Sequence, residues 1–332
     1  MTTMVDVARI AGVSASTVSH VLNGTRKVDK ATRLRVEAAI EKTGYRRNVV
    51  ARSLAAGRTH TVGLSISALT NPYFGSLVHA VERALSDAGY VLIVGDSHDD
   101  VDSEKRVTGS LLDRQVDGMI VAPAAGSERV TLPEITRTGT PLVLIDRGLD
   151  IECDQVGPEN FSSARSLTEH LLDLGHRRIA VVRGIAGISS TTERFDGYST
   201  ALADRGIAVD ADLVLDGYSN TDVAEREVHS LMSGESRPTA LVSLNNAMTI
   251  GTLKAVRSLG LTIPADVAFV CYDDFEWSDL FEPKLTAAAQ DVETIGATAV
   301  QLLLDRIRGH DGAPQRIRVP TTFHHRNSCG CT

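Results

Sequence analysis

From Thr61 onward, short apolar runs of strand length alternate with helical segments, and this alternation restricts the possible fold more than any other feature. The runs read "TVGLSIS", "YVLIVGD", "DGMIVAP", "PLVLIDR", "RRIAVVRG", "TALVSL" and "DVAFVCYD". The helical segments between them cover 74–88, 101–115, 160–174, 194–205, 222–233 and 245–259. Such alternation favours parallel sheets with right-handed helical crossovers. Roughly twelve strands exceed one typical sheet, so we predict an α/β body of two lobes with a cleft between them.

Charge is divided unevenly along the chain. Residues 1–60 carry 11 Lys and Arg against 4 Asp and Glu, a net charge of +7. The rest of the 332 residues carry 23 against 38, a net charge of −15, so the whole chain has −8. A basic head on an acidic body indicates a head that binds a polyanion, although a solvated helical face would show the same charge.

The head has the pattern of a helix-turn-helix. Thr3 and Asp6 form a capping signature before a first helix, and Gly12 permits a tight turn after it. Ser14 can cap a second helix over about 15–22, whose apolar side chains would face the first helix. A third amphipathic helix is expected from about Asp29 to Thr43.

The second helix carries small polar residues suited to the major groove of DNA. A recognition helix presents its N-terminal residues to base edges, and small side chains let the backbone come close. The candidates for contact with DNA in this head are Ser14, Ala15, Ser16, Thr17, Ser19, His20, Asn23, Arg26 and Tyr45. Ala15 offers a methyl group to thymine and His20 a donor to a purine, while the basic residues neutralise phosphates. A small helical subdomain that binds protein would have a similar pattern.

The quoted head, "VDVARIAGVSASTVSHVLNG" and "TRLRVEAAIEKTGYRRNVVARSLAAGRTHTVGL", resembles the LacI/GalR family of bacterial transcription regulators. The resemblance continues through "NPYFGSLVHAVERALSDAGY", "RQVDGMIVAP", "LLDLGHRRIAVVRG", "ERFDGY", "LTIPADVAFVCYDD" and "QLLLDRIRG". It covers essentially the whole chain in the expected order. It implies an all-α helix-turn-helix head, a hinge helix, and a two-lobed body like that of periplasmic binding proteins.

The resemblance also implies the domain boundaries. The head would cover 1–46, the hinge helix and linker 47–60, and the effector-binding and dimerisation body 61–332. Lobe 1 would consist of about 61–160 and 291–320, and lobe 2 of about 161–290 and 321–332.

By the same resemblance, residues 48–56 form a hinge helix that folds on operator DNA. Leu54 matches the family's apolar wedge in the minor groove, with Ala51 beside it and Arg52 contacting the DNA. An apolar side chain inserted between bases kinks the duplex at a cost of a few kcal/mol. The family implies a dimer on a palindromic operator. The tail "HHRNSCGCT" lacks the heptads that make the lactose repressor a tetramer, so a dimer is expected here.

Several body positions match the family's effector-contacting sites, and they follow strands or begin helices. They are Tyr73, Phe74, Arg147, Arg194, Asn245, Asp273, Trp277 and Gln290. Ligands of such sheets lie at the carboxyl ends of strands. A guanidinium can donate two hydrogen bonds, a carboxylate can accept from two sugar hydroxyls, and an indole can stack on a sugar ring.

Each of these side chains also has a purely structural alternative. Tyr73, Phe74 and Trp277 could belong to the core, and Arg194 and Asp273 could form an ion pair. Many family members have Asn-Asp where this chain has "NN" at 245–246, and Asp-Asn where it has "EN" at 159–160. These departures lie near the expected cleft, so the ligand of a relative does not transfer directly.

Other functions find little support in the sequence. The chain lacks the phosphate-binding loop, the serine nucleophile elbow and the H-E-x-x-H motif, so we expect no enzyme and no cofactor. The terminal C-x-C (Cys329 and Cys331) lacks partner ligands nearby and His324–His325 lacks a third, so no metal site is expected. We find no signal peptide or membrane span, and scattered cysteines suit a reducing cytoplasm.

The sequence therefore predicts a cytoplasmic, DNA-binding repressor, located at the nucleoid when bound to DNA. It would act as a homodimer under the control of a sugar-like effector, more often an inducer than a corepressor. Two alternatives stay open. One is a sugar-binding protein without a regulatory role, and the other is a corepressor-dependent regulator that responds to a nucleobase.

Overall fold

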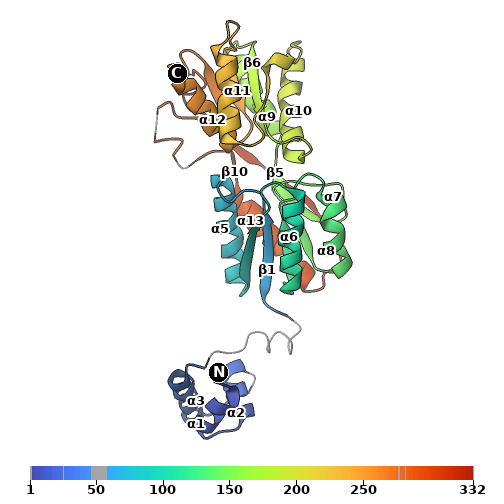
Figure 1. Ribbon diagram of the computed structural model, residues 1–332, viewed down its shortest axis with the longest axis vertical. Helices are drawn as coiled ribbons and strands as arrows, with labels where there is room; N and C mark the ends of the chain where they lie inside the picture. Colours follow the sequence, from blue (N-terminus) through green and yellow to red (C-terminus); the bar gives the residue numbers. More distant parts are fainter. Residues whose placement is uncertain (1, 25, 46–57, 276, 281, 332) are drawn as a thin grey trace. The chain divides into compact units, whose positions relative to one another are not determined.

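A computed structural model describes residues 2–24, 26–45, 58–275, 277–280 and 282–331. These residues belong to two compact units, Met1–Thr59 and His60–Thr332 (Figure 1). The predicted hinge helix at 48–56 lies outside the described residues, and so do Ala51, Arg52 and Leu54.

The described residues of unit 1 form three helices, α1 (Met4–Ala11), α2 (Ala15–Asn23) and α3 (Lys30–Thr43). Each begins at a side chain that accepts a hydrogen bond from the first turn: Thr3, Ser14 and Asp29. Such caps satisfy backbone N–H groups that have no partner within a helix. Gly12 follows α1 with φ of 64°, a left-handed conformation that glycine adopts without a steric penalty, and it turns the chain into α2.

The three helices enclose a small core of their own. Val7 of α1, Val18 of α2 and Val36 of α3 are all fully buried in it. Val13 and Val21, which the sequence places on the inner face of the helix-turn-helix, pack against this core. The predicted head of short helices is therefore confirmed.

Unit 2 contains two six-stranded sheets. The first has the spatial order β11 (Arg316–Val319), β5 (Asp154–Pro158), β4 (Leu142–Ile145), β3 (Gly118–Val121), β1 (Thr61–Ile66) and β2 (Val91–Asp96). All of its pairs are parallel, with Val62 opposite both Leu92 and Gly118. The helices of this lobe are α5 (Pro72–Asp87), α6 (Val101–Asp113), α7 (Ser127–Val130), α8 (Leu132–Thr138) and α13 (Val292–Ile307) (Figure 1).

The second sheet has the order β12 (Thr321–His324), β10 (Thr286–Gln290), β9 (Ala268–Tyr272), β8 (Ala240–Ser243), β6 (Ile179–Arg183) and β7 (Val214–Asp216). Its helices are α9 (Phe161–Asp173), α10 (Ser189–Ala203), η1 (Ala211–Leu213), α11 (Thr221–Ser233) and α12 (Asn246–Ser258). In both sheets the central strands are buried on both faces and read as continuous apolar runs.

One strand pair departs from the predicted parallel order. β12 runs antiparallel to β10, with Ala288 opposite Phe323. The reason is the connection, because the chain leaves this sheet after β10 and re-enters it from β11 of the other sheet, so β12 runs opposite to β10. The predicted α/β architecture, with an all-α head and two sheets flanked by helices, is otherwise confirmed.

The chain passes from one sheet to the other after β5, after β10 and after β11. These passages bring elements of both sheets to one cavity. It is lined by side chains at the carboxyl ends of β4 and β9 and at the N-terminal ends of α5, α10 and α12. No helix among the described residues is long and apolar enough to cross a membrane.

Candidate functional site

The N-terminal end of α2 presents small polar side chains to solvent. Ser14 Oγ accepts a hydrogen bond from the backbone N–H of Thr17 (3.1 Å) and lies 2.8 Å from the hydroxyls of Ser16 and Thr17. Ser14, Ala15 and Ser16 are exposed. The capping bond fixes the first turn of α2, and the exposed turn is narrow enough to approach a base edge closely.

The other predicted DNA contacts of the head have varied surroundings. Ser19 and His20 are half-buried on α2, Arg26 is exposed after it, and Tyr45 packs partly against the head core. The side chain of Asn23 lies outside the described residues. Sequence and structure thus agree on an exposed N-terminal turn of α2.

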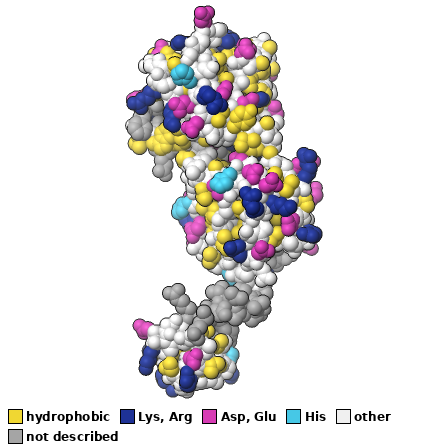
Figure 2. Space-filling view, viewed as in Figure 1, with side chains coloured by type: hydrophobic (Ala, Val, Ile, Leu, Met, Phe, Trp, Pro, Cys, Tyr) yellow, Lys and Arg dark blue, Asp and Glu magenta, His cyan; other side chains and the backbone are white. Residues whose placement is uncertain are grey.

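Basic side chains of unit 1 lie mostly in solvent. The exposed ones are Arg9, Arg26, Lys27, Lys30, Arg33, Arg35 and Lys42. Figure 2 shows Lys and Arg side chains, together with Asp and Glu side chains, on the visible face of unit 1. A cationic surface of this kind binds phosphates without reading sequence.

In unit 2, polar side chains from both sheets line one cavity of about 50 Å³. Seven of the predicted effector residues line it: Tyr73, Phe74, Arg147, Arg194, Asn245, Asp273 and Gln290. Asn71, Asp99, Asp146, Ser190, Thr191 and Ser219 also contribute to the wall. The cavity is far smaller than the 300–1,000 Å³ typical of sites for small molecules, because its polar groups bond to one another.

An ion cluster occupies the lobe 1 side of the cavity. Arg147 Nη1 lies 2.5 Å from Asp99 Oδ1, and Arg147 Nε lies 3.2 Å from Asp146 Oδ2. The Tyr73 hydroxyl donates to Asp146 Oδ1 at 2.7 Å. Burial and the nearby carboxylate of Asp146 raise the pKa of Tyr73, so the hydroxyl keeps its proton and stays a donor.

Asp273 sits at the lobe 2 side, directly after β9. Its Oδ2 accepts from the backbone N–H of Asn246 (3.0 Å) and its Oδ1 from Gln290 Nε2 (2.5 Å). Burial raises the pKa of Asp273, while nearby Arg194 opposes that rise. Gln290 Oε1 is buried and has no hydrogen-bond partner within the described residues. An unpartnered buried acceptor is costly, and a ligand donor would satisfy it.

Arg194 is held in a fixed orientation by three neighbours. Its Nε donates to Asn160 Oδ1 and its Nη1 to the carbonyl of Leu244, each at 2.8 Å. The guanidinium also lies 3.6 Å from the centre of the Tyr272 ring. These contacts fix the plane of the guanidinium, which suits directed hydrogen bonding to a ligand.

Asn245 serves as the cap of α12. Its Oδ1 accepts from the backbone N–H of Met248 (3.0 Å) and its Nδ2 donates to Ser219 Oγ (2.8 Å). The predicted binding residue therefore also has a structural task, because it starts the helix whose first N–H groups face the cavity.

Trp277 lies away from this cavity. Its ring stacks on Phe275, with the ring centres 4.1 Å apart, and it borders a separate hollow of about 590 Å³ beside Leu253, Pro264 and Pro283. The proximity of Trp277 to Asp273 in sequence does not bring the indole to the cavity, because the chain turns outward after β9.

Sequence reasoning missed several residues of the cavity. Asp146 was not predicted, although it ends the strand "PLVLID" next to Arg147. Asp99 belongs to "GDSHDD", which reads as a solvated loop until the fold brings it to Arg147. Glu104 is fully buried on α6 and accepts from the backbone N–H of Ala124 (2.6 Å), which fixes the loop that carries Pro123 against Arg147.

Comparison with known proteins decides the family. Residues 3–48 match the family described as "Bacterial regulatory proteins, lacI family", and residues 168–329 match a periplasmic binding protein-like domain. The chain is 33% identical to the transcriptional repressor PurR of Aliivibrio salmonicida over 93% of both proteins. The chain belongs to the lacI family. Its head and two-lobed body, like those of the family, make it a DNA-binding transcriptional regulator with an effector-binding domain.

Solved structures of family members have the same fold. A Lac repressor dimer bound to operator and the anti-inducer ONPF shares 28% identity, with a TM-score of 0.89 and 99% of both chains covered. A complex of the transcriptional regulator CelR with cellobiose shares 30% identity, with a TM-score of 0.75 and 99% and 100% of the two chains covered. The predicted body like that of periplasmic binding proteins is thus confirmed.

Proposed function

We propose that the chain is a repressor that binds a palindromic operator as a homodimer and is released by a sugar-like inducer. The Lac repressor relative is described as a dimer bound to operator, and the CelR relative as a complex with cellobiose. A dimer places two recognition helices on a two-fold axis, which matches the symmetry of a palindrome.

The cavity between the two sheets of unit 2 is the proposed effector site. The observation that carries this proposal is the gathering there of Arg147, Arg194, Asp273 and Gln290 from four separate segments. Fixed donors and acceptors opposite the aromatic ring of Tyr73 suit a ligand with many hydroxyls. The Gln290 Oε1 acceptor without a partner supports a ligand that donates a hydrogen bond there.

The size of the cavity supports a mechanism that couples effector to DNA. About 50 Å³ is less than a sugar ring occupies, so a ligand of that size would replace contacts such as Tyr73–Asp146 or Gln290–Asp273. A ligand that prefers one lobe arrangement shifts the population toward it. A typical coupling of about 1–3 kcal/mol corresponds to a roughly 5–150-fold change in operator affinity.

The DNA contacts follow from the head. We propose that Ser14, Ala15, Ser16, Thr17, Ser19, His20, Asn23, Arg26 and Tyr45 contact the operator, the first three at base edges and phosphates. Leu54 of the proposed hinge helix, with Ala51 beside it, would enter the minor groove, and Arg52 would neutralise phosphates. The exposed turn at Ser14–Ser16 supports this assignment.

A regulator of this kind acts on chromosomal DNA, so we place it in the cytoplasm, at the nucleoid when bound. The relatives compared above are transcriptional regulators, and we propose no catalytic role and no cofactor. A nucleobase corepressor is the second candidate effector, because the rings of Tyr73 and Phe74 line the cavity and offer an apolar wall against which a planar base could pack.

A thermal-shift screen tests the effector proposal. Purified full-length protein is heated with sugars, sugar phosphates, polyols and nucleobases, and a ligand at 100 times its Kd should add about 2.7 kcal/mol to the free energy of unfolding. The Asp273→Asn variant is screened in parallel, with Asp216→Asn, whose ion pair with Arg183 lies outside the cavity, as control. A hit lost only in Asp273→Asn supports the site, whereas a hit retained by Asp273→Asn excludes it.

A further inference from the structure

Two histidines and two cysteines converge at the C-terminal edge of lobe 2. Ligand atoms of His170, His325, Cys329 and Cys331 all lie within 4.8 Å of one another. Cys329 is buried, His170 and Cys331 are half-buried, and His325 is exposed. The group is therefore reachable from solvent and lies outside both the effector cavity and the DNA-binding head.

The spacing of these atoms fits a tetrahedral metal ion. Cys329 Sγ lies 3.6 Å from His325 Nε2, and Cys331 Sγ lies 3.5 Å from His170 Nε2. In a tetrahedral zinc site with ordinary Zn–S and Zn–N bonds, sulfur and nitrogen ligands are about 3.6 Å apart. The two imidazole rings stand nearly perpendicular, with centres 5.1 Å apart, so each can direct Nε2 to the same point.

The fold holds the ligands from three separate elements. His170 lies in the last turn of α9, His325 directly follows β12, and both cysteines belong to the tail. Gly330 between the cysteines has φ of 88°, and this left-handed turn lets both thiols face the site.

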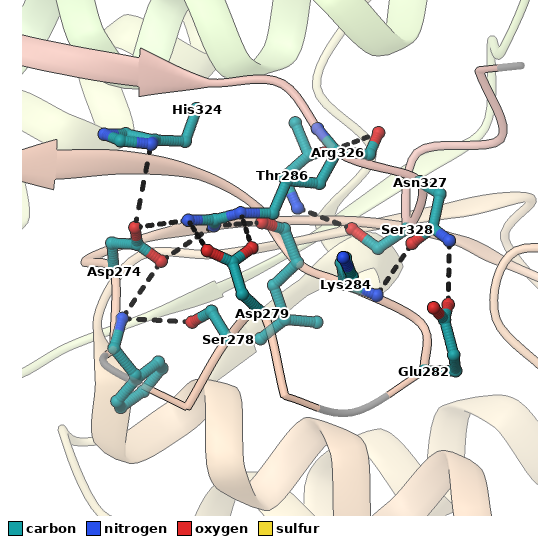
Figure 3. A network of polar contacts seen from close by, with 12 residues as sticks. Asp274, Ser278, Asp279, Glu282, Lys284, Thr286, His324, Arg326, Asn327 and Ser328 are labelled. Carbon is teal, nitrogen blue, oxygen red and sulfur yellow. Dashed lines mark hydrogen bonds and ion pairs between the residues drawn. The ribbon is translucent and has the colours of Figure 1, made fainter.

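The segment between His325 and Cys329 is anchored firmly. Asn327 Oδ1 accepts from the backbone N–H of Lys284 (2.7 Å), and Ser328 Oγ accepts from that of Thr286 (2.8 Å). Arg326 pairs with Asp274 at 2.7 Å, and Figure 3 shows how this network joins the tail to the strands of lobe 2. Ligands placed on anchored backbone lose little freedom when they bind a metal ion.

We propose that His170, His325, Cys329 and Cys331 bind one Zn²⁺ ion as a closed structural site. Two imidazole nitrogens and two thiolates form a familiar donor set for zinc, and two thiolates neutralise the charge of the ion. This proposal departs from the expectation of no metal site. The sequence offers the C-x-C and the His pair, but the fourth ligand, His170, is 161 residues away from Cys331.

Zinc at this site would join the C-terminal tail to α9. The tail otherwise contacts lobe 2 through hydrogen bonds, the ion pair of Arg326 with Asp274 and the burial of Cys329. Because metal binding to a site present only in the folded state stabilises that state, removal of zinc should lower the melting midpoint of the protein.

Metal content tests the proposal first. Full-length protein, free of any affinity tag and kept reduced, is loaded with Zn²⁺, desalted and analysed by mass spectrometry for metals. We expect about one Zn²⁺ per chain in the wild type, and none in the Cys329→Ser/Cys331→Ser double variant. His170→Gln should weaken zinc affinity by more than about 100-fold in competition with a chelator, since even an outer-shell partner is worth 10–100-fold.

Matched controls are Cys153→Ser in lobe 1 and His324→Gln, whose side chain faces Asp274 rather than the cluster. Both should keep the zinc. Retention of zinc by the double variant, or its absence from the loaded wild type, would overturn the proposal.

Cobalt gives a readout that needs no variant. Wild-type protein loaded with Co²⁺ should show the intense visible absorption of a tetrahedral ion together with thiolate-to-metal charge-transfer bands. A weak octahedral spectrum without thiolate bands would contradict a site built from these two cysteines.

Discussion

At the residue scale, Asp273 connects two elements that line the cavity. It has a left-handed backbone conformation with φ of 78°, and its carboxylate bonds the start of α12 through Asn246 and the end of β10 through Gln290. A non-glycine residue with this φ is uncommon and carries strain, which proteins retain mainly where function requires it. Asn tolerates the same conformation, so Asn is the substitution that changes charge with the least change in backbone.

Asp273→Asn should abolish the response to effector while operator binding in its absence stays within about threefold of the wild type. The amide oxygen can still accept from the backbone N–H of Asn246, but the carboxylate proposed to accept from ligand hydroxyls is gone. Fluorescence anisotropy of labelled operator, with and without effector, measures both quantities. An unchanged effector response would remove Asp273 from the site.

The raised pKa of Asp273 predicts a pH dependence of stability. Its folded-state pKa lies above the ordinary value of 3.8 because of burial, so the folded state binds the proton more tightly than the unfolded state. The free energy of unfolding therefore falls as pH rises from about 4 through the folded pKa. The Asp273→Asn variant has no carboxylate to ionise, so its free energy of unfolding does not fall with pH for this reason. Urea unfolding of both proteins over a pH series should show the variant gaining stability relative to the wild type as pH rises. A difference in the free energy of unfolding that stays constant with pH would contradict a raised pKa of Asp273.

Arg194→Lys should destabilise unit 2 by about 1.5–3 kcal/mol, the usual worth of hydrogen bonds from a charged group. Lysine cannot reproduce the two directed bonds to Asn160 and Leu244 or cover the Tyr272 ring. Denaturant unfolding measures the loss. Arg178→Lys, at an ion pair that is partly in solvent, is the control and should change stability by less than about 1 kcal/mol.

At the element scale, periodicity predicts what repeats locally and fails where the fold joins distant segments. The second helix was expected over 15–22 and runs from Ala15 to Asn23, because its cap Ser14 and the following Gly24 are both visible in the sequence. By contrast, the bond between Asp99 and Arg147 joins two loops that follow different strands. Neither loop has a local sequence pattern that predicts its partner. In the same way, no local pattern predicts that His170 lies beside the cysteines.

The contribution of the Ser14 cap to helix α2 can be tested by substitution. Ser14→Ala should destabilise the helix by about 1 kcal/mol because the N–H of Thr17 loses its acceptor, whereas Ser14→Gly should cost only a few tenths. We expect weaker specific operator binding for Ser14→Ala than for Ser14→Gly. Circular dichroism melts and operator titrations measure the two effects, and equal behaviour of the two variants would argue against the cap.

At the scale of the whole molecule, the proposed function depends on communication between the proposed effector cavity and the DNA-binding head. The chain passes between its two sheets three times, so a change in the angle between lobes moves the start of unit 2 at β1 relative to lobe 2. A cavity whose walls come from both lobes allows ligand binding to favour one lobe arrangement over another.

Leu54→Ala tests the proposed wedge, which lies outside the described residues. It should weaken specific operator binding by at least about tenfold and leave nonspecific binding nearly unchanged, because unstacking occurs only in the specific complex. Arg26→Ala provides the contrast. A phosphate contact should weaken both kinds of binding alike and reduce the salt slope by about one. Equal losses for Leu54→Ala in both assays would exclude the wedge.

The most direct test of the account is the operator affinity of the full-length protein with and without a ligand found by thermal shift. The operator is a palindromic duplex recovered from a random pool by selection with the same protein. The account predicts that the ligand raises the operator Kd by roughly 5–150-fold in the wild type and leaves it unchanged in Asp273→Asn. An operator Kd that no stabilising ligand alters, or an equal change in Asp273→Asn, would contradict the claim that this cavity controls DNA binding.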